Sequence, residues 1–357
     1  MSEAVDRQAL YGGTEAPPAH LELDRAKLSA YLAERLPGFG TLTDVVKFKG
    51  GQSNPTYLIT ATGGRYALRR KPPGTLVQSA HEIDREYRVM SALVDVGIPV
   101  PRPHLYCDDK AVIDSDFYIA DYVEGRVYWE AWMPDAAPEG RAASYDDMNG
   151  ILARLHDLDP AAVGLAELGP PTGYAARNLA RWSKIYRFAA LTEIPDMDWL
   201  MDALAERVPQ AAPTTLIHGD FGLYNMILHP TAPDVLAVLD WEMATLGDPY
   251  VDLAHHLRPW WDPPDDRGST TFLTGRDLAA LGIPGMDDYI DRYCKRRGVG
   301  LPDMTWYLAY AQFRYASMVQ GILKRAADGT NSSRVMLHRQ DRVALLAAMA
   351  RKTLATS

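Results

Sequence analysis

The chain changes character about one third of the way along, and this change limits the folds open to it. Residues 44–69 read as three short strands joined by glycine-containing turns, and the apolar residues of 83–94 repeat with the period of a helix. A further strand is predicted at 117–120. After residue 126 the sequence is mostly helical, except for a pair of short strands within 226–239. We therefore predict an α+β fold with a β-rich N-terminal lobe and a mainly helical C-terminal lobe.

The length and composition suit two lobes of a globular protein. The chain has 357 residues, of which 47% are hydrophobic and 23% charged, whereas a typical single domain has about 100–150 residues. We expect a mobile N-terminal arm at 1–20, because this segment is polar and contains Pro17 and Pro18. The N-terminal lobe is then expected at 21–125 and the C-terminal lobe at 126–357.

Charge, cysteine content and hydropathy argue against several classes of protein. A net charge of −9 argues against a general nucleic-acid binder. The two cysteines, Cys107 and Cys294, have neither metal-ligand nor redox spacing, which favours a reducing compartment. No secretory signal is visible, and no apolar run approaches the roughly 18 residues of a membrane span. We expect a cytoplasmic protein that binds neither nucleic acid nor membrane; the sequence does not indicate its oligomeric state.

The strongest chemical signal is the segment 218–225, which reads HGDFGLYN. Asp220 and Asn225 have the spacing of a kinase catalytic loop, and Asp240 ends the predicted hairpin that begins after Asn225. Phosphoryl transfer needs an oriented hydroxyl and neutralised phosphate charge. Asp220 could orient or deprotonate the hydroxyl, while the oxygens of Asn225 and Asp240 suit Mg²⁺. Asp and Asn also cap turns, so each residue alone has a purely structural explanation.

These motifs resemble the aminoglycoside phosphotransferase and choline kinase superfamily, over about Leu42 to Leu257. Within it, the chain is most similar to the kinase-like domain fused to some acyl-CoA dehydrogenases and to the stand-alone bacterial relatives of that domain. The stretches that carry this similarity are 50–54, 68–74, 85–87 and 320–321. The resemblance implies a two-lobed protein-kinase-like fold, ATP or GTP and Mg²⁺ as cofactors, and a small-molecule substrate. It also implies that Asp220 is catalytic and that Asn225 and Asp240 are metal ligands.

The N-terminal half supplies candidates for nucleotide binding. Gly50 and Gly51 lie in a turn between strands, where the backbone could approach phosphates, and Ser53 and Asn54 could donate hydrogen bonds. Such glycines are also common as plain turn residues. By resemblance, the carbonyl of Asp121 and the amide of Val123 would bind the adenine edge, and the range 121–125 would end the lobe.

One nucleotide-binding position departs from the kinase pattern. Kinases carry a Lys on the third strand that contacts the α- and β-phosphates and pairs with a Glu on the next helix. Here Arg69 occupies that position and Glu86 is its expected partner. Arginine and lysine are not interchangeable, so Lys71 remains an alternative to Arg69.

The segment after Asp240 is expected to be structural. Asp248 and Pro249 have the pattern of a helix start. Asp252 could brace the catalytic loop or stabilise the helix N-terminus. The adjacent His255 and His256 point about 100° apart on a helix, which disfavours a shared metal. We expect His218 to orient the loop and His156 to lie in the core or at an interface.

The acceptor-binding residues are the least constrained. Arg177, Arg181 and Lys184 fall on one helical face in a segment without acids. This face is either solvated or a wall that binds an anionic acceptor. Glu242 and Arg314 are further substrate candidates.

We therefore predict a phosphotransferase that acts on a small-molecule hydroxyl of an anionic hydroxy acid or hydroxyacyl-CoA. The alternatives are a nucleotide-binding pseudokinase with a regulatory or scaffolding role, and an aminoglycoside- or choline-type kinase. A protein substrate is disfavoured, because no activation loop fits between Asp240 and Asp248.

Overall fold

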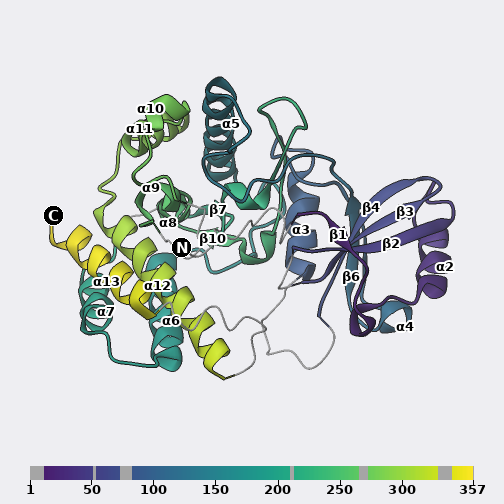
Figure 1. Ribbon diagram of the computed structural model, residues 1–357, viewed down its shortest axis with the longest axis horizontal. Coiled ribbons are helices and arrows are strands. Elements are labelled where there is room, and N and C mark those ends of the chain that lie inside the picture. The colour runs from purple at the N-terminus through teal and green to yellow at the C-terminus, as the bar shows by residue number, and fades with distance from the viewer. Residues whose placement is uncertain are drawn as a thin grey trace, which may run out of the picture.

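The computed structural model describes residues 12–50, 54–72, 83–209, 213–264, 272–328 and 340–356. It confirms the predicted α+β class and the two-lobed kinase-like arrangement, with an antiparallel sheet in one lobe and helices in the other (Figure 1). The sheet has six strands in the order β1-β2-β3-β4-β6-β5. Their bounds are Thr14–Glu15 (β1), Leu42–Phe48 (β2), Thr56–Ala61 (β3), Gly64–Arg70 (β4), Pro103–Cys107 (β5) and Phe117–Asp121 (β6).

The sheet forms because side chains alternate between its two faces. On β3, Tyr57 and Ile59 are fully buried while their neighbours are partly exposed. Helix α2 (Arg25–Arg35) covers that buried face through Leu28 and Leu32, and α4 (Lys110–Ile113) closes the same core. The N-terminal lobe therefore has its own hydrophobic core.

The predicted mobile arm at 1–20 is only partly described, and its described part is tied to the sheet. Residues 1–11 lie outside the described residues. Thr14 and Glu15 pair with Phe48 and Lys47 of β2, and a short 3₁₀ helix follows at Ala19–Leu21. In this part the chain therefore pairs with the sheet, because the edge of β2 offers free backbone groups that β1 satisfies.

Helix α3 (Ile83–Leu93) matches the predicted amphipathic helix and connects the lobes. Its buried side chains, including Val89, Met90 and Leu93, join the core of the C-terminal lobe and not that of α2. In Figure 1 this helix stands between the sheet and the helical lobe. The lobes therefore share apolar contacts through α3.

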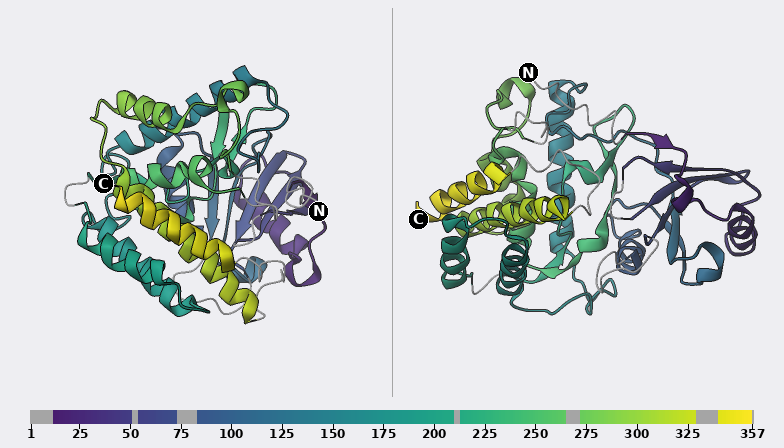
Figure 2. Two further views of the ribbon diagram at one scale, coloured as in Figure 1. Left: turned by 60° about the vertical axis from the view of Figure 1, so that its left-hand side comes forward. Right: turned by 60° about the horizontal axis from the view of Figure 1, so that its bottom comes forward.

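Long helices build the C-terminal lobe around one core. Their bounds are Pro138–Asp157 (α5), Tyr174–Ala189 (α6), Pro195–Glu206 (α7), Pro249–His256 (α8), Met286–Arg297 (α11), Thr305–Ala327 (α12) and Gln340–Ala355 (α13). Two short helices complete the lobe, at Arg258–Trp261 (α9) and Leu278–Leu281 (α10). Helix α12 packs against α13 and α6, as both views of Figure 2 show. Among the described residues, no helix is long and apolar enough to cross a membrane.

Two small sheets hold the segment that carries the catalytic motif. β7 (Thr215–Ile217) pairs with β10 (Thr245–Gly247), and β8 (Met226–Leu228) pairs with β9 (Val235–Val238). The hairpin β8–β9 was predicted. β7 and β10 were missed, because three-residue strands far apart in sequence leave little local pattern. The loops after β7 and after β9 are thereby clamped at both ends.

The chain passes between the lobes beside the β8–β9 hairpin. Arg126 pairs with Leu228 through both backbone groups, and its side chain donates to the carbonyls of His229 and Ala232. A side chain at Gly125 would meet the Leu228 carbonyl oxygen at 2.2 Å, so glycine is needed there. We propose this crossing as the boundary between the lobes.

Candidate active site

Asp220 lies in the loop after β7, with both carboxylate oxygens engaged. Its Oδ1 accepts a hydrogen bond from the Tyr224 hydroxyl at 2.8 Å and lies 2.8 Å from His255 Nε2. Its Oδ2 accepts from Asn225 Nδ2 at 3.1 Å. The preceding Gly219 has a φ of +83°, and a side chain there would meet the Met243 carbonyl oxygen at 2.8 Å. The loop geometry therefore requires glycine before Asp220.

These contacts set the charge of the carboxylate. Burial alone would raise the pKa of Asp220, but the hydrogen bonds from His255 and Tyr224 outweigh it and hold that pKa far below its usual range. Burial lowers the pKa of His255, which is therefore neutral at pH 7. A carboxylate with so low a pKa is better suited to orienting a hydroxyl than to removing its proton.

Asp252 of α8 braces the catalytic loop by accepting hydrogen bonds from its backbone. Its carboxylate accepts from the backbone amides of His218 at 2.8 Å and Gly219 at 2.9 Å, and His156 Nε2 lies 3.2 Å away. Burial opposes ionisation, but the hydrogen bond from His156 and these amides lower the pKa of Asp252 to about 2. Of the two roles considered for Asp252, the structure thus shows the brace.

Arg314 supports the same loop from α12. Its side chain is only 3% exposed, and it donates to the Gly219 carbonyl at 2.7 Å. Its guanidinium carbon also lies 5.5 Å from the Trp182 ring centre. The structure therefore places Arg314 behind the loop, although the sequence suggested a residue that binds substrate.

Asn225 and Asp240 are brought together by the β8–β9 hairpin. The Leu239 amide donates to the Asn225 carbonyl at 2.8 Å, which sets Asp240 one residue beyond that contact. Because the Asn225 Nδ2 donates to Asp220, the Asn225 side-chain oxygen remains for another partner. Asp240 has a φ of +68°, which is uncommon outside glycine and often marks functional sites.

Arg69 joins the two lobes at this point. Its Nε lies 2.8 Å from Glu86 Oε2, and its Nη2 lies 2.5 Å from Asp240 Oδ1. The ion pair expected between Arg69 and Glu86 is thus present. Lys71 instead pairs with Asp116 at 2.8 Å. Of the two candidates for the kinase lysine position, Arg69 is the one beside Asp240.

Glu242 and Asn54 extend this charged cluster. Asn54 is fully buried and donates to Glu242 at 2.8 Å, so its amide is directed to the C-terminal lobe and is not left for a phosphate. Burial, together with the nearby Asp240, raises the pKa of Glu242 to about 7. Glu242 therefore belongs to the cluster around Arg69.

The donor set fits Mg²⁺ of the kind that kinases use. Among the described residues, no cluster of three or more His, Cys, Asp or Glu side chains is arranged to hold a metal. One carboxylate (Asp240) and one amide oxygen (Asn225) suffice for Mg²⁺, because it keeps waters and takes further oxygens from nucleotide phosphates. The crowding of Asp240, Glu242 and Glu86 around one arginine also favours a second cation.

Of the other residues predicted to bind the nucleotide, Asp121 and Val123 are among the described residues. Gly51 and Ser53 lie outside the described residues. Asp121 ends β6, and its side chain lies 2.6 Å from His104 Nε2; Val123 follows it in an irregular segment and is partly buried. Their backbone contacts to a nucleotide base remain a prediction.

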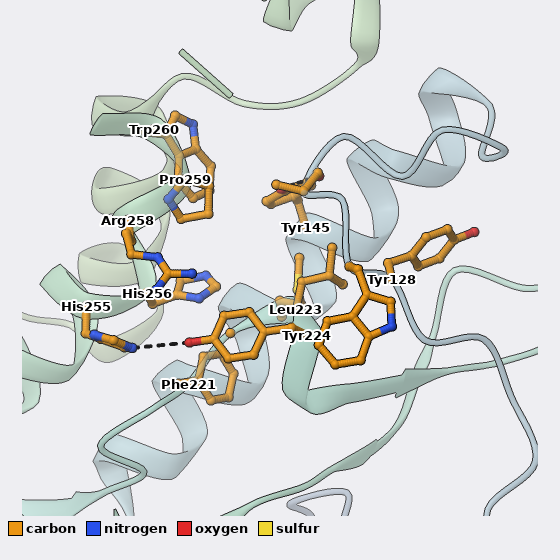
Figure 3. Close-up of a pocket in the computed structure, with 14 residues that line it drawn as sticks. Tyr128, Tyr145, Phe221, Leu223, Tyr224, His255, His256, Arg258, Pro259 and Trp260 are labelled. Atoms are coloured by element: carbon orange, nitrogen blue, oxygen red, sulfur yellow. Dashed lines mark hydrogen bonds between the residues drawn. The ribbon is translucent and has the colours of Figure 1, made fainter. Parts of the chain in front are cut away.

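A pocket is lined by Tyr224 and His255 (Figure 3), the two side chains that contact Asp220 Oδ1. Its walls are mainly aromatic and contain no Asp or Glu among their 14 residues. The six large aromatic residues are Tyr128, Trp129, Tyr145, Phe221, Tyr224 and Trp260. The basic residues predicted to bind an acceptor do not line it: Arg177, Arg181 and Lys184 lie on the exposed face of α6, and Lys184 borders a different hollow, between α6 and α7.

A comparison with protein families agrees with the kinase-like fold and catalytic loop described above. A profile of the phosphotransferase enzyme family matches residues 44–289. The chain belongs to this family. A crystal structure from Ralstonia eutropha, named as a candidate aminoglycoside phosphotransferase, is 40% identical and covers 94% of this chain and 99% of its own, with a TM-score of 0.84.

Two further similarities refine the picture of this phosphotransferase family member. Acyl-CoA dehydrogenase family member 11 of Rattus norvegicus is 40% identical over 89% of the chain, which spans 42% of that relative. The chain thus spans less than half of the length of the acyl-CoA dehydrogenase relatives that it matches. An aminoglycoside phosphotransferase in ternary complex with ADP and hygromycin B is 15% identical, covers 93% of this chain and 99% of its own, and has a TM-score of 0.59, so it shares the fold.

Sequence analysis missed three residues of this site: Tyr224, His255 and Arg258. His255 was considered only as a metal ligand. The usable signal was its spacing of three residues from Asp252, since i and i+3 share a helix face. Asp248 caps α8 through the Tyr250 amide at 2.9 Å, which confirms the predicted helix start.

Proposed function

We propose that this chain transfers the γ-phosphoryl group of ATP or GTP to a hydroxyl of a small molecule. The observation that carries the proposal is the grouping of Asp220, Asn225 and Asp240, held by two small sheets and joined to the N-terminal lobe by Arg69. Together these residues supply what phosphoryl transfer needs. Asp220 orients the hydroxyl, Asn225 and Asp240 offer oxygen ligands for Mg²⁺, and Arg69 is a cation for the phosphate.

Each residue then has a defined task. Asp220 accepts the hydrogen bond of the acceptor hydroxyl and aims its oxygen at the phosphoryl group. Tyr224 and His255 hold the carboxylate in one orientation. Mg²⁺, held by Asn225 and Asp240 when bound, would neutralise phosphate charge. Arg69 would donate to phosphate oxygens while Glu86 fixes its position.

For the acceptor we propose an anionic hydroxy acid or hydroxyacyl-CoA. The pocket beside Asp220 lacks carboxylates in its lining, whereas a polycationic aminoglycoside calls for acidic walls. The relatives that carry the acyl-CoA dehydrogenase name suggest acyl chemistry by analogy alone. We also propose the cytoplasm as the compartment, because Cys107 and Cys294 are both unpaired and buried.

A nucleotide-binding pseudokinase is the second candidate. One observation favours it: Arg69 contacts Asp240, a proposed metal ligand, at 2.5 Å. An arginine fixed there would compete with Mg²⁺ for the same carboxylate oxygen. Measured Mg²⁺-dependent binding of ATP, without phosphoryl transfer to any acceptor, would favour this alternative.

The test is a phosphoryl-transfer screen with wild-type protein and Asp220→Asn. Hydroxy acids, hydroxyacyl-CoA esters, amino alcohols and aminoglycosides are incubated with ATP or GTP and Mg²⁺. We expect wild-type turnover of the anionic panel, and a loss of about 100-fold or more in Asp220→Asn with nucleotide affinity retained. Full activity of the variant, or turnover of cationic acceptors alone, would contradict the proposal.

A further inference from the structure

The pocket next to the catalytic loop contains an arginine that has no ion pair with any residue that the structure describes. Arg258, the first residue of α9, lines the pocket. Its guanidinium carbon lies 5.4 Å from the Tyr224 ring centre and 4.7 Å from that of Tyr315. Neither an ion pair nor a hydrogen bond of its guanidinium exists among the described parts of the chain. The two rings therefore hold Arg258 in place without using its N–H groups.

Three other shielded arginines have a carboxylate partner, whereas the buried Arg314 donates to the Gly219 carbonyl. Arg69, Arg297 and Arg342 each form an ion pair with a carboxylate. A guanidinium has five N–H donors, and those of the half-buried Arg258 are not among the buried atoms that lack a partner, so they face solvent and are open to an anionic group. Arg258 can therefore donate hydrogen bonds to a ligand that comes from outside the chain.

The surroundings of Arg258 define what such a ligand must look like. The walls are aromatic and include no carboxylate, and the free volume between them is about 20 Å³, so only one small group of a ligand fits inside. Tyr224 connects the two ends of the pocket: its ring lies next to Arg258, and its hydroxyl donates to Asp220. Figure 3 shows Arg258 directed toward the Tyr224 ring and His255 next to the Tyr224 hydroxyl. Arg258 and Asp220 are therefore separated by about one tyrosine side chain.

We propose that Arg258 binds the carboxylate or phosphate group of the acceptor while Asp220 receives its hydroxyl. This inference rests on the proposed function and adds the residue that selects the acceptor. It moves the anion site from the basic face of α6, where Arg177 and Arg181 are exposed, to α9.

The experiment measures binding and transfer separately in the full chain with ADP or ATP and Mg²⁺. The probes are short-chain hydroxy acids, glycerol phosphate, and uncharged amides of the same hydroxy acids. Trp129 and Trp260 line the pocket, so intrinsic fluorescence reports binding. The variants are Arg258→Gln and Arg258→Lys, with Arg154→Gln, an exposed arginine of α5, as the matched control. Arg181→Gln tests the basic face of α6.

We expect Arg258→Gln to weaken binding of the anionic probes that bind wild type by about 10- to 100-fold, which is the usual effect of losing a charged hydrogen bond. Binding of the amides and of ADP should not change, and Arg258→Lys should recover part of the loss. Arg154→Gln should match wild type.

Three results would overturn the proposal: no anionic probe binds wild type, Arg258→Gln weakens acids and amides equally, or Arg181→Gln alone reproduces the loss. If acids bind in an Arg258-dependent way but no phosphoryl transfer follows, the reaction proposed above fails while the anion site stands.

Discussion

At the scale of single residues, the site depends on how the carboxylate of Asp220 is held. Asp220 has both carboxylate oxygens engaged by side chains of the same lobe, and its pKa is held far below the ordinary range. The side chain is therefore fixed before any ligand arrives, and an incoming hydroxyl meets an acceptor that is already oriented. Arg258 shows the opposite case, a cation held between two rings whose donors have no partner in the part of the chain that the structure describes.

The arginine at the kinase lysine position gives the first residue-level prediction. Arg69→Ala should weaken binding of ATP with Mg²⁺ and lower the melting temperature, because Glu86 would be left buried without a counter-charge. Arg69→Lys should recover part of both, since a single ammonium cannot contact Glu86 and Asp240 as a planar fork does. Calorimetry and thermal unfolding measure the two effects. Lys71→Ala tests the alternative residue for the same position. Loss of ATP binding in Lys71→Ala but not in Arg69→Ala would refute the role of Arg69.

The second residue-level prediction concerns His256, which is buried against Tyr289 with Nε2 2.7 Å from its hydroxyl. Burial lowers the pKa of His256 from 6.5 to about 4. The unfolded state therefore binds more protons between these values, and stability falls as pH drops from 6.5 toward 4. This group should account for about 3 kcal/mol of that fall.

Urea unfolding of wild type and His256→Gln between pH 7 and pH 4 measures the contribution. The free energy of unfolding of the variant should depend less steeply on pH across this window. Parallel curves for the two proteins would show that His256 does not titrate as the structure implies.

At the scale of elements, α8 organises the catalytic loop although it contributes no group to the reaction itself. One helix places Asp252 on the backbone amides of His218 and Gly219 and His255 on Asp220. Its start is fixed by the Asp248 cap with proline at the first turn. A shift of this short helix would move the loop with it.

The element-level prediction is that Asp252→Asn lowers both turnover and stability. An amide can accept only one of the two backbone hydrogen bonds without bringing its own donors against N–H groups, so a loss of about 1.5–3 kcal/mol is expected. Nucleotide affinity should stay near wild type, because Asp252 touches only the catalytic loop and His156. Asp248→Asn on the same helix is the matched control, since Asn caps as well as Asp. Equal stability of Asp252→Asn and wild type would contradict the bracing role.

At the scale of the whole molecule, two contacts tie the lobes together at the proposed metal site. Arg69 reaches Asp240 across 171 positions of sequence, and Asn54 reaches Glu242 across 188. The carboxylates Asp240 and Glu242 of the C-terminal lobe thus meet donors of the N-terminal lobe. Binding of a nucleotide with Mg²⁺ at this point should stabilise both lobes at once.

The whole-molecule prediction follows from this linkage. ADP with Mg²⁺ at 100 times its dissociation constant should stabilise the wild-type fold by about 2.7 kcal/mol, measured as a rise in melting temperature. Chelation of Mg²⁺ should remove most of the rise. Asp240→Ala should abolish the Mg²⁺-dependent part and Asn225→Ala should reduce it, because only the first removes a charged ligand. A Mg²⁺-dependent rise that persists in Asp240→Ala would refute the metal assignment.

Local features of the chain determined most of the fold. Alternating and helical hydrophobic periods predicted β2, β3, β4, β6, α3 and the β8–β9 hairpin, because these patterns depend on neighbours within a few residues. The spacing of Asp220, Asn225 and Asp240 likewise predicted a phosphotransferase, since one loop and one hairpin carry all three. The expected partner of Arg69 was predicted correctly as Glu86.

Only the tertiary structure decided which distant side chains meet. His255 reaches Asp220 from 35 positions away, and Arg314 reaches Gly219 from 95. No local pattern distinguishes a buried arginine such as Arg314 from an exposed one such as Arg181, because charge runs look alike in sequence and burial depends on which helices pack together. For the same reason sequence analysis placed the anionic acceptor at α6, whereas the structure places Arg258 of α9 over the ring of Tyr224, whose hydroxyl donates to Asp220.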